Sequence, residues 1–495
     1  FEFDRDFELV LEDDSMDYDI YRLAEPMMPG DSVLFTFALS NKPNEILRNN
    51  SPVRNNGTFI NNSLFPSIGY PESIELSSRE ARERYELPPK QRMAPPTDST
   101  ARMDNYISSD ADWIDFETTI STSPEQIAIA PGYLQDEWEE DGRRYFHYKM
   151  DSTIVNFYSF ISAEFDVVQD EWNDVSIEIY HYPEHTYNLD YMIDGVKKSL
   201  DYYTENFSPY QFRQLRIIEF PRTGGSFAQS FANTVPYSEG VGFIADVDTT
   251  DEEAVNYPFS ITAHEVAHQW WAHQVIGANV QGATMLSESL SEYSALKVLE
   301  KEYGVHQMRR FLKDALDSYL IGRTMESQKE MPLIYNENQQ YIHYNKGSLV
   351  FYALSDYIGE DKLNGALSDY IDDVAFQEPP YTTSLELVEY LEEATPDSLQ
   401  YLIKDMFETI TLYDNRVEEA IYTEVDSSTY EVNMTLQASK YRTSETGERI
   451  YKNEAGDSLS VEIEDRRRPV ESLPLNDWIE VGVFGVDEEG NETVL

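Results

Sequence analysis

One stretch decides the fold of this chain: His264-Glu265-Val266-Ala267-His268-Gln269-Trp270-Trp271. Two histidines four residues apart share one face of a helix, so both rings can point at one ion. The glutamate beside the first histidine lies about 100° around the same helix. This H-E-x-x-H spacing is typical of a helix that holds catalytic zinc, and such a site needs a third protein ligand and an open position for water. The stretch therefore predicts a zinc-binding helix and a further ligand elsewhere in the chain.

A second helix is predicted downstream, where apolar residues recur at helical spacing and Gly304 is a suitable stop. These apolar residues are Leu286, Leu290, Tyr293 and Leu296. Glu288 and Glu292 lie one turn apart and leave this helix on one side. We expect Glu288 to be the third ligand, and Glu292 to accept the second ring N–H of a ligating histidine, which fixes its tautomer. Alone, this pair would suit a solvated acidic face as well, but the upstream motif favours the ligand.

The run from His264 to Glu292 resembles the gluzincin aminopeptidase family, which includes aminopeptidase N and leukotriene hydrolase. In that family H-E-x-x-H-Q-W is followed by a ligand glutamate in a W-L-N-E-G-like segment, and Met285-Leu286-Ser287-Glu288-Ser289 takes its place here. The family usually has eighteen residues between the second histidine and this glutamate, whereas residues 269 to 287 intervene here, which is nineteen. Because Ser287 is a poor zinc ligand, we expect the extra residue in the Gly277–Gly282 loop.

Further segments carry the same resemblance, which covers roughly residues 30 to 410 and is strongest from 195 to 355. Tyr344-Asn345-Lys346-Gly347 is similar to the family's Y-E-K-G, which implies that Tyr344 stabilises the oxyanion of the tetrahedral intermediate. The alternative for Tyr344 is a packed helix tyrosine among 35 tyrosines. Tyr237-Ser238-Glu239 resembles the Y-R-E that closes the family's substrate-binding strand. We therefore expect Tyr237, and His343 beside Tyr344, to be substrate-binding residues.

One departure from the family pattern concerns recognition of the N-terminus of the peptide substrate. Before Tyr237 the family carries G-x-M-E-N, whose glutamate binds the free α-amino group of a peptide. This chain has no carboxylate between Gly224 and Asn233. Gln229, with Ser230 beside it, could accept a hydrogen bond from an ammonium group, although a neutral amide gives a weaker contact than a charge-assisted one. Peptide cleavage is therefore predicted more firmly than recognition of a free N-terminus.

The resemblance implies a zinc metallopeptidase with one zinc ion and a peptide substrate, most simply an aminopeptidase-type exopeptidase acting on short peptides. Glu265 would take a proton from the zinc-bound water and pass it to the leaving amine. Two alternatives stay open. One is an endopeptidase, or a peptidase with altered end recognition. The other is a non-catalytic peptide-binding or assembly module of a membrane transporter complex.

Composition limits the partners. The chain has 495 residues, no cysteine and a formal net charge of −55. This charge strongly disfavours nucleic acids and anionic membrane surfaces as partners. The absence of cysteine excludes disulfides. Repulsion of this size is screened by salt, so we expect a salt-adapted bacterial protein.

The pattern along the chain predicts an α+β multidomain protein. We expect a β-rich N-terminal domain over residues 1–170, with a short helix from Ser77 to Leu87, a mainly helical domain over 171–412, and a small β-sandwich over 413–495. The resemblance implies that the first domain is saddle-like and that the second is the thermolysin-like catalytic domain. The strand-like stretches at the two chain ends predict that both outer domains are truncated. The segments 56–59, 66–70 and 281–286 resemble peptidase domains fused to bacterial transporter-like permeases, which implies an extracytoplasmic, membrane-tethered domain with a permease portion in the same full-length protein.

Overall fold

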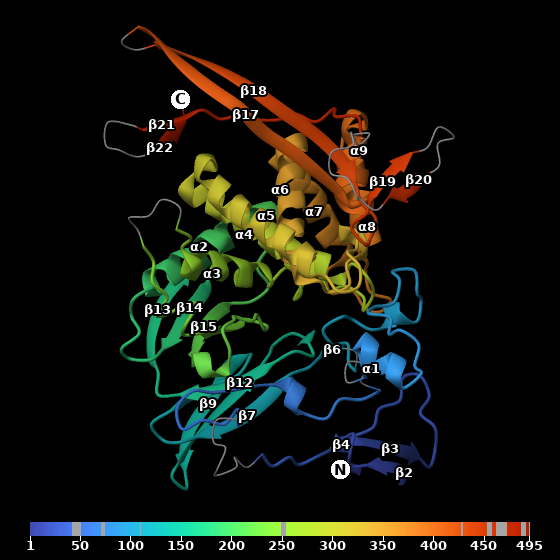
Figure 1. The fold of residues 1–495 in the computed structure, drawn as a ribbon. Coiled ribbons are helices and arrows are strands. Elements are labelled where there is room, and N and C mark those ends of the chain that lie inside the picture. Colours follow the sequence, from blue (N-terminus) through green and yellow to red (C-terminus); the bar gives the residue numbers. More distant parts are fainter. Residues whose placement is uncertain are drawn as a thin grey trace.

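The structure is a computed structural model. It describes residues 1–41, 51–70, 75–108, 110–248, 254–426, 429–452, 458–461, 473–486 and 492–494. A β-rich N-terminal part, drawn blue to teal in Figure 1, lies at one end of the molecule, and helices form the middle. A long hairpin crosses the opposite end. Within the described ranges, no helix combines the length and the apolar character that a bilayer crossing requires.

The N-terminal part is built from small antiparallel sheets, as its alternating pattern predicts. Their order is β1-β4, β2-β3, β5-β12-β8, β7-β10-β9 and β11-β6. The strands are β1 (Glu2–Phe3), β2 (Phe7–Asp13), β3 (Tyr18–Leu23), β4 (Phe35–Thr36), β5 (Thr58–Asn61), β6 (Trp113–Ile114), β7 (Glu117–Thr122), β8 (Ile127–Ile129), β9 (Tyr133–Glu140), β10 (Arg143–Lys149), β11 (Ile154–Val155) and β12 (Ser159–Ala163). The predicted charged helix is present as α1 (Arg79–Arg84), and the Ser78 side chain caps it by accepting from the Ala81 N–H.

A four-stranded sheet, β13-β14-β15-β16, connects this part to the helices. Its strands are β13 (Asp166–Trp172), β14 (Val175–His181), β15 (Gln214–Phe220) and β16 (Thr234–Ser238). β13 and β14 are antiparallel, whereas β14, β15 and β16 are parallel. Helix α2 (Leu189–Asn206) makes the crossover between β14 and β15.

The helical part follows the predicted 3.6-residue periodicity. Its helices are α3 (Tyr257–Ala267), α4 (Leu290–Tyr303), α5 (Met308–Met325), α6 (Gly347–Ile358), α7 (Glu360–Val374), α8 (Ser384–Ala394) and α9 (Gln400–Ile403). Three π-turns interrupt this order, Met285–Ser289 before α4, Tyr341–Lys346 before α6 and Lys404–Glu408 after α9. Two of them carry residues that the sequence predicts for the site.

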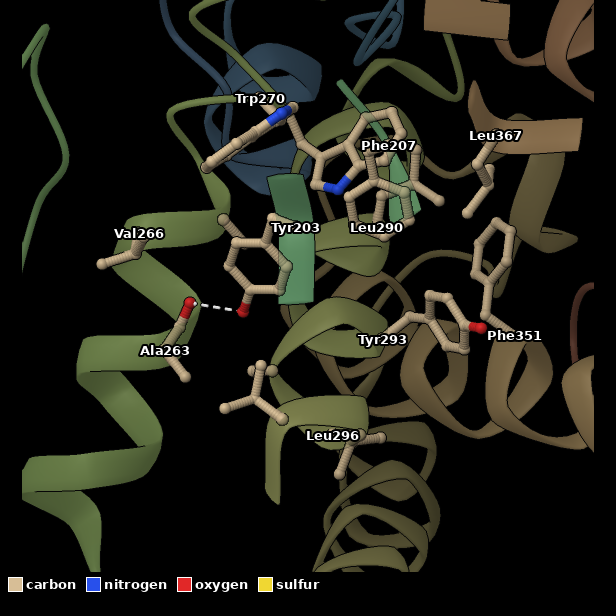
Figure 2. Close-up of a cluster of buried hydrophobic side chains, with 14 of the residues drawn as sticks. Tyr203, Phe207, Ala263, Val266, Trp270, Leu290, Tyr293, Leu296, Phe351 and Leu367 are labelled. Carbon is tan, nitrogen blue, oxygen red and sulfur yellow. Dashed lines mark hydrogen bonds between the residues drawn. The ribbon is translucent and has the colours of Figure 1, made fainter. Parts of the chain in front are cut away.

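Aromatic packing fixes α3 against its neighbours, as Figure 2 shows. The Tyr203 hydroxyl of α2 donates to the Ala263 carbonyl at 2.9 Å, and the Tyr203 ring lies 5.4 Å from Trp270. The Trp271 indole donates to Ser294 Oγ of α4 at 2.9 Å. Both tryptophans are fully buried. The end of α3 that carries the two histidines is therefore held by α2 and α4.

The C-terminal part differs from the predicted β-sandwich. Its described strands form three separate two-stranded sheets. They are β17 (Thr411–Asp426) with β18 (Thr429–Arg442), β19 (Arg449–Lys452) with β20 (Ser458–Val461), and β21 (Phe484–Val486) with β22 (Glu492–Val494). Alternating polar and apolar residues identify β17 and β18 as strands, but alternation does not specify a second sheet to pack on them. Residues 478–484 are rich in apolar side chains that suit a strand, but only Phe484 of them lies in one.

Candidate metal centre

Three side chains converge on one point. His264 lies in α3, His268 directly follows its last residue, and Glu288 comes from the π-turn Met285–Ser289. The two Nε2 atoms lie 3.0 Å apart, and Glu288 Oε2 lies 3.5 Å from that of His264 and 3.3 Å from that of His268. Ligands about 2.0–2.1 Å from a tetrahedral zinc ion are about 3.3 Å from one another. The Glu288 Oε2 atom is buried without a hydrogen-bond partner. The donor set and its spacing therefore fit zinc.

The outer nitrogens of the two rings are also held in place. His268 Nδ1 lies 3.1 Å from the Trp271 carbonyl oxygen and 3.0 Å from Ser291 Oγ. His264 Nδ1 lies 3.0 Å from Glu292 Oε1, which places Glu292 where the sequence predicts it. This contact is close but not aligned as a hydrogen bond. Ser291 was not predicted, because a serine in an apolar helix carries no distinguishing pattern.

The π-turn before α4 bears on the irregular ligand spacing. A π-turn holds one residue more than an α-turn. The nineteenth residue between His268 and Glu288 therefore has a place within this helix, besides the predicted place in the Gly277–Gly282 loop.

Charges around the ligands set their proton affinities. Burial lowers the pKa of His264, but the Glu292 and Glu288 carboxylates raise it well above the ordinary histidine range. Burial raises the pKa of Glu288, but His268 and His264 hold it well below its usual range. Without metal, the carboxylates therefore favour a proton on His264, and the two histidines favour the ionised form of Glu288.

Glu265 is buried beside the ligands and outside their triangle. Burial raises its pKa, while His264 and His268 act in the opposite direction. A carboxylate whose pKa is raised toward neutrality is suited to general acid–base work. Tyr237 is fully buried, and burial followed by the Glu265 charge raises its pKa. The Tyr237 hydroxyl donates to the Tyr257 carbonyl at 3.4 Å, so the predicted substrate residue is a buried tyrosine that feels the charge of the predicted base.

Tyr344 lies in the π-turn Tyr341–Lys346, with its ring 5.8 Å from the His264 ring and 4.5 Å from the His343 ring. Burial, and then the Glu288 and Glu265 carboxylates, raise the Tyr344 pKa strongly, so its hydroxyl keeps its proton and can donate. Burial lowers the pKa of His343 to about 4, which makes it a neutral imidazole near pH 7. The structure therefore brings Tyr344 and His343 to the ligands, as the sequence predicts.

The segment from Phe227 to Phe231 forms the edge beside β16. Ala228 pairs with Tyr237, and Phe231 pairs with Thr234, both antiparallel. Gln269, the residue after the second ligand histidine, donates from Nε2 to Ser230 Oγ at 2.6 Å and to the Phe231 carbonyl at 2.9 Å. This bond makes Ser230 part of the anchor between the edge and α3.

Two other side chains of this region, His273 and Gln229, differ in whether they have a hydrogen-bond partner. His273 lies 3.1 Å from the Ser230 carbonyl oxygen through Nε2 and is buried, so it supports the same edge. Gln229 Oε1 is buried without a partner. Of the predicted pair, Gln229 therefore has a free acceptor, whereas Ser230 Oγ already accepts from Gln269.

A second histidine–carboxylate group contains His185, Glu219 and Glu239. Its atoms already have partners. His185 Nδ1 lies 2.5 Å from Glu219 Oε1, and the Tyr182 N–H donates to Glu219 Oε2 at 2.6 Å. This group therefore lacks the buried, unpartnered carboxylate oxygen found at Glu288.

Comparison with known proteins supports the family resemblance. Residues 191–409 match the Peptidase family M1 domain. The chain is 22% identical to endoplasmic reticulum aminopeptidase 2 of Homo sapiens over 262 residues, which is 51% of this chain and 26% of that protein. It is 23% identical to probable aminopeptidase 1 of Sulfurisphaera tokodaii over 222 residues, 43% of this chain and 28% of the relative. With Tricorn protease-interacting factor F2 of Thermoplasma volcanium it shares 24% identity over 200 residues, 38% of this chain and 24% of the relative.

These matches cover between 24% and 28% of the length of the three relatives. The family match contains the three converging ligands, Glu265 and Tyr344. Residues 191–409 therefore match the Peptidase family M1 domain, and the similarity to these aminopeptidases supports the resemblance to the gluzincin aminopeptidase family that the sequence carries.

Proposed function

We propose that this chain is a zinc metallopeptidase that hydrolyses peptide bonds with a metal-activated water. The observation that carries the proposal is the triangle of His264, His268 and Glu288, with Glu265 and Tyr344 beside it. When bound there, zinc supplies Lewis acidity and lowers the pKa of its water to about 7.

The chain's own residues then have separate tasks. Glu265 accepts the proton of the attacking water and returns it to the leaving amine. The Tyr344 hydroxyl, which keeps its proton, donates to the oxyanion that forms on the scissile carbonyl. Neutral His343 lies beside Tyr344 and offers a second uncharged polar group to the peptide backbone.

The preferred form of this function is an aminopeptidase acting on short peptides. Gln229 supports it, because its buried Oε1 has no partner and can accept a hydrogen bond from an α-ammonium group. Burying an acceptor without a partner costs free energy that such a ligand would offset. Two of the three relatives are named as aminopeptidases, which agrees with this form of the function.

A peptidase with altered end recognition, or an endopeptidase, is the second candidate. It is favoured by one observation, the absence of any carboxylate between Gly224 and Asn233. A non-catalytic zinc module is disfavoured, because structural zinc needs neither a base such as Glu265 nor a donor such as Tyr344. Tethering to a permease outside the cytoplasm stays a prediction.

The test combines metal analysis with pairs of short peptides that differ only in N-terminal acetylation. An aminopeptidase should contain one zinc ion and cleave the free peptide faster. Gln229→Glu should then lower KM for the free peptide by about fivefold to tenfold, since a charge-assisted bond adds roughly 1 kcal/mol, while Gln229→Leu should raise it. Faster cleavage of the acetylated peptide would support the second candidate instead. Bound zinc without cleavage of either peptide would contradict a peptidase.

A further inference from the structure

The π-turn that carries Tyr344 is fixed at its first residue, Tyr341. The Tyr341 hydroxyl donates to Glu326 Oε2 at 3.1 Å, and Gln339 Nε2 donates to the same oxygen at 2.5 Å. The Tyr341 ring stacks on Tyr319 of α5, with centroids 6.2 Å apart. A Cβ added at Gly322 of α5 would lie only 2.2 Å from the Tyr341 Cβ. Tyr341 is therefore seated tightly between α5 and the Glu326 carboxylate.

The last residue of the same turn also meets α5. Lys346 is buried, and its ammonium group lies 5.9 Å from the centre of the Tyr319 ring. Tyr319 in turn donates to Glu330 Oε1 at 2.6 Å. Both ends of the turn thus depend on α5 and on the acidic residues that follow it.

Glu326 receives its counter-charge from the N-terminal part of the molecule. Arg92 NH2 lies 2.7 Å from Glu326 Oε1, and Arg92 NH1 lies 3.4 Å from Oε2, so both carboxylate oxygens are engaged. The Glu326 side chain is only 10% exposed. Burial raises the pKa of Glu326, but hydrogen bonds from Arg92, Gln328 and Gln339 and the Arg92 charge hold it at about 2. Without Arg92, this carboxylate would be left partly buried and, within the described part of the chain, without an ion-pair partner.

We propose that Arg92 is a positioning residue for Tyr344. It holds Glu326, which holds Tyr341, and thereby sets the turn that aims the Tyr344 hydroxyl at the metal centre. The oxyanion donor is then in place only while the N-terminal part is docked on α5. The expected effect of Arg92 on peptide hydrolysis rests on the proposed peptidase function. Its expected effect on the placement of Tyr344 does not.

A second arginine of the N-terminal part provides a matched control. Arg102 NH2 lies 2.6 Å from Glu386 of α8, and it also donates to the Tyr381 carbonyl at 3.0 Å. Its side chain is 25% exposed, against 23% for Arg92. Among the contacts of the described residues, it makes none with the Tyr341–Lys346 turn. A general role in docking predicts equal effects for both arginines, whereas positioning of Tyr344 predicts an effect for Arg92 alone.

The first measurement does not depend on hydrolysis. Fluorotyrosine placed at position 344 of the full chain gives a single fluorine NMR resonance that reports the surroundings of this ring. Arg92→Ala should shift or broaden the resonance, with and without zinc, and Arg102→Ala should leave it within its line width. An unchanged resonance in Arg92→Ala, or the same change in Arg102→Ala, would overturn the proposal. If Arg92→Ala does not melt cooperatively, Tyr341→Phe replaces it, because it removes only the hydroxyl that reaches Glu326.

The second measurement is a double-mutant cycle on peptide hydrolysis. Arg92→Ala should lower kcat about tenfold or more at unchanged zinc content and nearly unchanged KM, because small misplacements of a catalytic group are costly. In a Tyr344→Phe background the same change should cost less than about twofold, since the positioned group is gone. If Arg92→Ala lowers kcat by the same factor in the wild-type and the Tyr344→Phe backgrounds, the proposal is overturned. A wild-type chain that binds zinc but cleaves nothing would contradict the proposed function instead, and the fluorine resonance would still decide the role of Arg92.

Discussion

The role of Tyr344 leads to a prediction whose size follows from its surroundings. Tyr344→Phe removes the hydroxyl and keeps the ring, whose centroid lies 4.5 Å from that of His343 and 5.8 Å from that of His264. The ligand triangle loses no ligand in this variant. The lost contact is one proton donor, which the strongly raised Tyr344 pKa keeps protonated at every working pH.

Loss of a single oxyanion donor costs other enzymes about 3–4 kcal/mol, or roughly 100-fold to 1000-fold in kcat. We expect a fall of this size in kcat with KM changed by less than about threefold, because the negative charge develops only in the transition state. The assay is steady-state hydrolysis of a short peptide by protein with one zinc ion per chain. A zinc-replete Tyr344→Phe with kcat within about threefold of wild type would refute the assigned role, and so would a rise in KM alone.

Three further outcomes are expected. Gly322→Ala should force Tyr341 away from α5, because the added Cβ would lie 2.2 Å from the Tyr341 Cβ. This overpacking should lower the free energy of unfolding by about 1–3 kcal/mol. It should also lower kcat while the zinc content stays normal. An unchanged melting temperature and kcat would speak against this packing. Zinc affinity should rise with pH, because Glu292 and Glu288 raise the pKa of His264 against the effect of burial, and this proton must leave before the ring binds metal. Calorimetry that finds the same affinity and no proton release between about pH 5.5 and 8 would contradict this. The melting temperature should rise from low to molar sodium chloride, since the Debye length falls to about 3 Å and screens a net charge of −55. No rise would remove the argument for salt adaptation.

The metal-binding half of the site followed from local pattern. Spacing of four between His264 and His268 and helical periodicity around Glu288 were enough to predict two facing ligand-bearing helices, and the structure brings these residues together. Glu292 lies 3.0 Å from His264 Nδ1, but the two groups are not aligned as the predicted hydrogen bond. The π-turn at Met285–Ser289 escaped prediction because one extra residue in a helix shifts its periodicity only locally.

Long-range contacts were beyond the sequence. Arg92 and Glu326 are 234 positions apart, and nothing in the local pattern of either residue indicates the other. The two-stranded sheets from β17 onward were predicted as strands but not as separate hairpins, because alternation reports the faces of a strand and not what covers them. The anchoring of Ser230 by Gln269 likewise depends on a tertiary contact.

The central claim is that Glu265 activates a metal-bound water held by His264, His268 and Glu288. The most direct test is Glu265→Gln, which keeps the shape of a buried side chain and removes its basicity. Zinc content and peptide hydrolysis are measured on the same wild-type and variant samples. We expect one zinc ion in both, and a fall in kcat of roughly 100-fold to 10,000-fold in the variant. A zinc-replete Glu265→Gln that cleaves as fast as wild type would contradict the account.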